Sequence, residues 1–253
     1  MKPATATLLF FAAVIGGAIN SVAGGGTFIA FPALLFAGVP AVAANATNTM
    51  ALWPGALASV IAYRRELGAS RRELLPLGLA SLVGGLVGSV LLLRTSDRKF
   101  SLLVPWLLLF ATLLFSSGGE IAKRGSGGAR ASLLGVIGIQ LVISIYGGYF
   151  GGGIGIMMLA TLSLMGMKDI HRMNALKTML ATLVNGIAVV AFIVAGAIAW
   201  GPAAVMIGGG ILGGYAGAAF ARRVSPRLVR RLVLTIAWTM TAYFFARTYA
   251  LAS

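Results

Sequence analysis

The chain has 253 residues, of which 59% are hydrophobic and only 10% are charged, with a formal net charge of +15 at pH 7. A soluble globular protein is usually about 45–50% apolar and about 25% charged, so this chain has too few polar residues to cover a surface in water. The composition excludes a cytosolic enzyme, a nucleic-acid-binding protein and a disordered protein, and it predicts an all-α polytopic membrane protein in a lipid bilayer.

Long apolar segments follow one another along the chain, and a bilayer-spanning helix needs roughly 20 such residues. Two segments, 27–37 and 154–167, are short, and each follows a glycine triplet, Gly24–Gly26 or Gly151–Gly153. Glycine costs about 1 kcal/mol relative to alanine within a helix, so each triplet predicts a helix that is interrupted inside the membrane. We expect about seven to eight transmembrane segments by length. The apolar segments lie at 5–23, 27–37, 42–63, 74–93, 100–117, 131–149, 154–167, 173–199, 201–221 and 232–246.

The first segment has an alternative interpretation as a secretory signal peptide, because small residues at Ser21–Ala23 would suit cleavage. Only one lysine precedes it, and the segment belongs to an internal repeat, so we expect it to be retained.

The two halves of the chain carry similar motifs in the same order. Gly24–Gly26 matches Gly151–Gly153, and Asn45–Thr49 matches Asn174–Thr178 at nearly the same offset. Farther along, Gly84 and Gly88 match Gly213 and Gly217; glycines at this spacing allow helices to cross closely. We expect one transmembrane domain over 1–253, in which 5–117 and 131–248 are homologous helical repeats separated by a polar linker at 118–130.

The loop charges distinguish two topologies. If every long segment crosses the membrane once, Lys and Arg divide almost equally between the two sides, which contradicts the positive-inside rule. If 5–37 and 131–167 each enter and leave on the same side, the basic segments all become cytoplasmic. This second topology makes the repeats inverted, and we favour it over a broken first helix that crosses the whole membrane. The basic segments are 64–72, 118–130, 168–172 and 222–231.

The glycine breaks supply the first candidate substrate-binding residues. A helix that begins at a break has unpaired N–H groups and about half a positive charge at its end, and such ends bind anions. The alternative is that the glycines only allow close helix crossing. The candidates are Gly24, Gly25, Gly26, Thr27, Gly151, Gly152 and Gly153.

Polar residues at two matched helix starts supply the second group, and their amides and hydroxyls could hydrogen-bond an anion or only join helices. Lys177 is the one lysine inside a predicted span, where a charge is costly and often functional, although its ammonium could instead reach the membrane surface. Asn20 and Ser21, just before the first triplet, could join the site. The main candidates are Asn45, Thr47, Asn48, Thr49, Asn174, Lys177 and Thr178.

The remaining chemistry is sparse. The chain has no cysteine and a single histidine, His171, so we expect no metal site, no cofactor and no intramembrane serine protease. A relay of membrane carboxylates is not expected, and a Na⁺ site would depend on carbonyl and amide oxygens. A non-transporting membrane subunit is a further alternative, but it has no need of two matched helix breaks. All five acidic residues lie in predicted loops, namely Glu66, Glu73, Asp97, Glu120 and Asp169.

The stretch Gly24–Leu35, followed by Gly38-Val39-Pro40 and Ala43–Thr49, resembles the first-half signature of the sulfite exporter TauE/SafE family. Gly151–Gly155 and Asn174–Thr178 resemble its second-half counterpart. The family is expected to have Ala-Thr-Ser where this chain has Ala46-Thr47-Asn48.

The resemblance implies a multi-pass transporter of the bacterial inner membrane that exports sulfite, a sulfonate or a related organosulfur anion by alternating access. A transporter of another small solute or ion on the same fold is the alternative. The sequence is compatible with a homo-oligomer.

Overall fold

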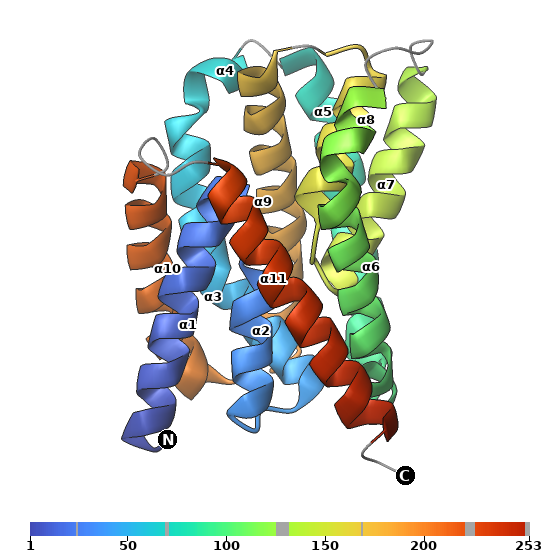
Figure 1. The fold of residues 1–253 in the computed structure, drawn as a ribbon. Helices are drawn as coiled ribbons and strands as arrows, with labels where there is room; N and C mark the ends of the chain where they lie inside the picture. The colour runs from blue at the N-terminus through green and yellow to red at the C-terminus, as the bar shows by residue number, and fades with distance from the viewer. Residues whose placement is uncertain (24, 69–70, 125–131, 168, 221–225, 251–253) are drawn as a thin grey trace.

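The computed structural model describes residues 1–23, 25–68, 71–124, 132–167, 169–220 and 226–250 (Figure 1). Within these residues it consists of helices joined by short turns and contains no strand. A short π-helical turn, Ala246–Ala250, follows the last α-helix. The α-helices are α1 (Pro3–Ala23), α2 (Thr27–Phe36), α3 (Ala41–Ala62), α4 (Arg64–Gly68), α5 (Arg71–Arg94), α6 (Asp97–Arg124), α7 (Leu133–Tyr149), α8 (Ile154–Leu164), α9 (Ile170–Val194), α10 (Trp200–Phe220) and α11 (Pro226–Phe245).

The outer surface of the bundle is apolar. Large hydrophobic side chains point outward, and Leu134 and Val194 are 81% and 83% exposed. Among the described residues, four helices contain spans long and apolar enough to cross a membrane, and these confirm a polytopic membrane protein. The spans are Pro3–Ser21, Glu73–Arg94, Asp97–Ser117 and Ile170–Val194.

Both predicted helix breaks are present. The chain leaves α1 at Ala23 and begins α2 at Thr27, and it leaves α7 at Tyr149 and begins α8 at Ile154. Gly151 and Gly153 have φ angles of +83° and +79°, a conformation that other residues rarely adopt. The second break therefore depends on glycine for its backbone geometry.

Two details differ from the sequence prediction. The short helix α4 was not expected, and α6 continues to Arg124, through part of the segment assigned to the polar linker. Both regions contain Glu, Arg and Lys or Leu, which are good helix formers, and their polarity alone does not end a helix.

Each pair of short and long helices forms a hairpin within the bundle. In Figure 1, α1 rises from the end where both chain termini lie, and α2 returns toward that end. The α7–α8 pair enters from the opposite end and returns to it. That opposite end also holds α4 and the ends of α5, α6 and α9 that border basic segments, whereas α11 begins at a lower level, beside the upper end of α1.

Helices at matched positions in the two halves make matching contacts. α1 packs on α10 while α7 packs on α5, and α3 packs on α10 while α9 packs on α5. Two pairs of counterparts also meet directly, α3 against α9 and α6 against α11. Thr112 and Thr241 share a hydrogen bond of 3.1 Å, and Trp53 donates one of 3.1 Å to the Thr182 carbonyl; each pair is separated by 129 residues, the offset that aligns Asn45 with Asn174.

The cross-half contacts are backbone to backbone at glycines. A Cβ on Gly213 of α10 would overlap the Val14 carbonyl of α1, and a Cβ on Gly84 of α5 would overlap the Leu141 carbonyl of α7. In a bilayer the hydrophobic effect does not hold helices together, so close approach at small residues supplies much of the packing energy. These glycines therefore join the two halves.

Gly213→Ala tests this packing. The added methyl group has no space beside the Val14 carbonyl, and overpacking of this kind costs about 1–3 kcal/mol. We expect a thermal midpoint several degrees below that of the wild type in detergent, measured by intrinsic fluorescence. Gly208→Ala on the same helix is the control, because nothing lies within 4 Å of its added methyl group. Equal midpoints for the two variants would contradict the packing role.

Candidate functional site

A cavity of about 150 Å³ lies between the two halves, at the level of both glycine breaks. Its wall includes Thr27 at the start of α2 and Ile154 and Gly155 at the start of α8. Both interrupted helices therefore begin at the cavity. The first N–H groups of a helix have no partner within that helix, so the two starts present donors and partial positive charge to this space.

Seven of the predicted site residues meet in this cavity. They come from the start of α2, the first turns of α3 and α9, and the second glycine triplet. They are Thr27, Asn48, Thr49, Gly151, Asn174, Lys177 and Thr178.

The cavity wall uses matched positions from α3 and α9. Asn48 and Thr49 face the cavity from α3, and their counterparts Lys177 and Thr178 face it from α9. The α3 and α9 helices pack directly against each other, so the two sets lie on opposite sides of one space. The site is therefore shared by both halves.

Among the residues that the structure describes, Lys177 is the one cation of the wall, and no acidic residue lines the cavity. The described residues give its ammonium group no hydrogen bond or ion pair. A Cβ on Gly155 would lie 3.3 Å from Lys177 Cδ, so the absence of a side chain at Gly155 leaves room for the lysine stem. The arrangement places one positive charge among neutral amide and hydroxyl groups.

The structure adds wall residues that the motifs did not identify. Asn185 lies two turns beyond Lys177 on α9, and Ser59 and Tyr63 lie near the end of α3. Asn20 and Ser21 of α1, which the sequence suggested as further candidates, also line the cavity. The additional α3 and α9 residues continue the faces of Asn48 and Lys177 at intervals of three or four residues, and helical periodicity could have indicated them.

Two predicted polar residues lie outside the cavity wall. Asn45 donates a hydrogen bond of 3.0 Å to the Tyr149 carbonyl at the end of α7. Thr47 is fully buried and accepts one of 3.0 Å from the Ala199 N–H, just before α10. Both side chains therefore connect α3 to other helices.

The remaining glycine candidates also lie outside the wall. A Cβ on Gly25 would press on Val233, and one on Gly26 would overlap the Gly16 carbonyl. A Cβ on Gly152 would press on the Phe150 ring, whereas Gly153 has the positive φ angle given above. These glycines permit close packing and the chain reversal, and Gly24 is outside the described residues.

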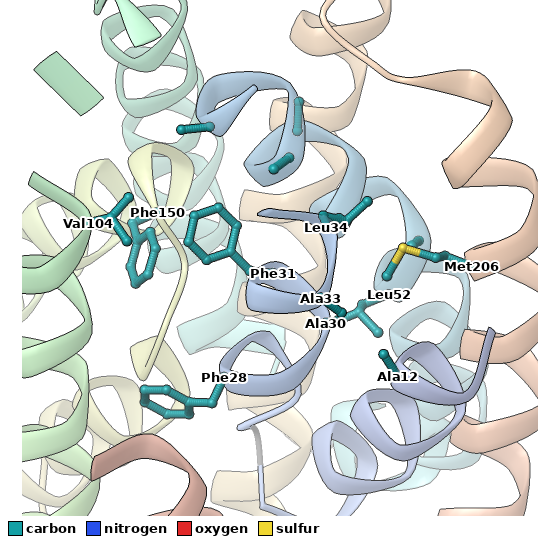
Figure 2. Close-up of a cluster of buried hydrophobic side chains, with 14 of the residues drawn as sticks. Ala12, Phe28, Ala30, Phe31, Ala33, Leu34, Leu52, Val104, Phe150 and Met206 are labelled. Atoms are coloured by element: carbon teal, nitrogen blue, oxygen red, sulfur yellow. The ribbon is translucent and has the colours of Figure 1, made fainter. Parts of the chain in front are cut away.

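A chain of aromatic rings begins at one wall of the cavity. Phe150 belongs to the wall, and its ring centroid lies 5.6 Å from that of Phe31 (Figure 2). Phe31 contacts Phe100 at 6.4 Å, and Phe100 contacts Tyr149 at 5.6 Å. We call these four rings the aromatic barrier. Because α2 runs from the cavity toward the end that holds the chain termini, the barrier lies between the cavity and that end (Figure 1).

The opposite side of the wall extends along α3 from Asn48 to Tyr63, the residue that precedes α4. The cavity thus reaches toward the end of the bundle that carries the basic segments (Figure 1).

The sequence model of the sulfite exporter TauE/SafE family matches residues 9–244. This match covers nearly the whole chain, including both glycine breaks and the entire cavity wall.

The chain belongs to the sulfite exporter TauE/SafE family.

Several curated relatives are named as transporters. A probable membrane transporter protein of Haemophilus influenzae is 28% identical over 93% of this chain and 92% of its own length. A Sinorhizobium protein, probable membrane transporter protein ORF9, is 28% identical over 90% and 87%. Probable membrane transporter protein YfcA of Escherichia coli K12 is 27% identical over 96% and 90%. No solved structure matches the chain.

The open side of the cavity can be tested by cysteine labelling, because the chain contains no native cysteine. We expect Ser59→Cys to react with a membrane-impermeant maleimide faster in inside-out than in right-side-out vesicles, since the cavity extends toward the basic end. Thr112→Cys is the control, because Thr112 is fully buried at the α6–α11 contact and should stay unlabelled from either side. Faster labelling of Ser59→Cys from the outside would contradict this assignment.

Proposed function

We propose that the protein is a secondary transporter that exports a small sulfur-containing oxyanion, such as sulfite or a sulfonate, by alternating access. One observation carries the proposal: among the described residues, the cavity wall has one ammonium group, that of Lys177, which has no ion-pair partner, and no carboxylate. An intramembrane charge is costly and is typically retained for function.

The wall has the chemistry to replace the hydration shell of such an anion. Lys177 supplies the charge, while the hydroxyls of Thr27, Thr49 and Thr178 and the amide of Asn174 can donate hydrogen bonds to sulfonyl oxygens. The starts of α2 and α8 add partial positive charge from two directions. An anion in the cavity would therefore be stabilised by groups from both halves.

We propose that the domain consists of two inverted repeats, 5–117 and 131–248, joined by the segment 118–130. The matching contacts of α1 with α10 and of α7 with α5 support this division, as do the opposite directions of the two hairpins. In transporters of this design, the substrate site lies at the repeat interface, where one repeat moves against the other. The aromatic barrier would then have to open while the Tyr63 side closes.

We further propose that the basic segments are cytoplasmic and that the protein resides in the bacterial inner membrane. The positive-inside rule supports this orientation, because basic segments at α4, α6 and α9 border one end of the bundle (Figure 1). The cavity in the structure would then be accessible from the cytoplasm, as the loading state of an exporter requires.

A different small anion is the second candidate substrate. Asn48, which stands where the resemblance predicts serine, has its side chain in the cavity wall. An amide is larger than a hydroxyl and presents both donor and acceptor groups, so it favours another shape or pattern of oxygens.

Sulfite flux in proteoliposomes tests the proposal. We expect saturable flux above that of empty liposomes, competition by sulfoacetate or taurine, and at least tenfold slower flux for Lys177→Ala, because a charge-assisted hydrogen bond is worth about 1.5–3 kcal/mol. Lys2→Ala is the control, since Lys2 is exposed near the N-terminus and should leave flux unchanged.

Correct folding of Lys177→Ala is checked by its thermal midpoint. If the folded, inserted wild type moves none of these anions and none of them competes, the sulfur-anion assignment is wrong. Unchanged flux in Lys177→Ala would show that the lysine does not contribute to anion transport.

A further inference from the structure

Two amide oxygens on α3 are buried without a hydrogen-bond donor. Asn45 and Asn48 are 1% and 2% exposed, and within the described part of the chain the Oδ1 atom of each has no partner. Buried polar atoms are nearly always paired, so two such oxygens on adjacent turns of one helix require an explanation.

The amide nitrogens are already engaged. Asn45 Nδ2 donates to the Tyr149 carbonyl at 3.0 Å, and that carbonyl oxygen can only accept, which fixes the orientation of the amide. Asn48 Nδ2 donates to Thr27 Oγ1 at 3.4 Å. Each amide therefore directs its oxygen elsewhere, and the three-residue spacing places both side chains on the same face of α3.

The Asn45 amide lies at the C-terminal end of α7, which favours positive charge there. Tyr149 is the last residue of α7, and the C-terminal end of a helix carries about half a negative charge. Within the described residues, no group of three His, Cys, Asp or Glu side chains could hold a metal ion. Neutral amide oxygens near a helix C-terminus suit a monovalent hard cation better than a divalent one.

The two halves of the chain differ in charge at one matched position of the site, Asn48 in the first half and Lys177 in the second. The residues that match Asn45 and Asn48 are Asn174 and Lys177, which have the same spacing on α9. At this position the second half has a covalently attached cation, whereas the first half has an amide oxygen without a partner. A bound ion next to Asn48 would give the two halves equivalent charges on opposite sides of the cavity.

We propose that the Oδ1 atoms of Asn45 and Asn48 bind a sodium ion. Asn48 also lines the cavity, so the ion would lie beside the transported anion and raise its affinity. The binding site itself is independent of the transported substrate. Its role as the coupling-ion site rests on the proposed function.

Sodium binding can be measured without transport. The purified full-length chain in detergent is heated in NaCl, KCl or choline chloride at constant ionic strength, and unfolding is followed by intrinsic fluorescence. A ligand that binds only the folded state raises the midpoint, and at about ten times its Kd we expect a rise of roughly 3–6 °C in sodium over choline.

Two variants assign the effect to these oxygens. Asn48→Leu keeps the volume but removes the ligand oxygen, so the sodium-dependent shift should disappear. Asn174→Leu is the matched control at the equivalent end of α9, and it should keep the shift. If Asn48→Leu does not fold, Asn48→Asp replaces it; a carboxylate there should produce the half-maximal shift at a lower sodium concentration.

The outcomes separate this inference from the proposed function. A missing shift in the wild type, an equal shift in all three salts, or a shift retained in Asn48→Leu or unchanged by Asn48→Asp would each overturn the sodium site. Anion flux that ignores a sodium gradient would overturn coupling while the proposed function stands. A sodium shift without flux of any tested anion would leave the site intact and refute the proposed function.

Discussion

Two helices stop inside this bundle, and the enclosure of their ends determines the arrangement of the other helices. A lipid chain cannot hydrogen-bond the N–H and C=O groups that α1, α2, α7 and α8 leave at the breaks, so protein or a cavity must surround them. α10 and α5 lie against α1 and α7, while α3 and α9 complete the enclosure. Gly213 brings α10 close to α1, and Gly84 brings α5 close to α7. If these helices were farther apart, lipid could reach the unpaired backbone groups at the breaks.

The polar cavity lies inside this enclosure, between the two halves of the chain. Its wall is nearly symmetric in position but not in charge, since Lys177 on α9 stands opposite Asn48 on α3. A single charge in a neutral wall favours anions. The two amide oxygens on α3 that have no donor are the complementary feature, since they present partial negative charge. Lys177 lies near the start of α9, and the two amides lie near the start of α3.

The sequence predicted the parts of the site that local motifs mark. The glycine triplets indicated the breaks, and the matched helix starts indicated Asn48, Thr49, Asn174, Lys177 and Thr178, because their spacing repeats along the chain. The specific roles of Asn45 and Thr47 could not be predicted, because they depend on Tyr149 and Ala199, which are distant in sequence. Asn185 and Ser59 belong to no motif, but they continue the helix faces of Lys177 and Asn48, so the helical period would have indicated them once those faces were known. Likewise, helix formers in 118–124 continue α6 beyond the point where polarity suggested a linker.

Phe150 belongs both to the cavity wall and to the aromatic barrier. A solute in the cavity would therefore meet the aromatic barrier directly at Phe150. Because this ring packs against Phe31, movement of one side chain would connect occupancy of the cavity to the packing of the barrier. Loss of the ring would extend the cavity toward Phe31 while the polar groups of the wall remained in place.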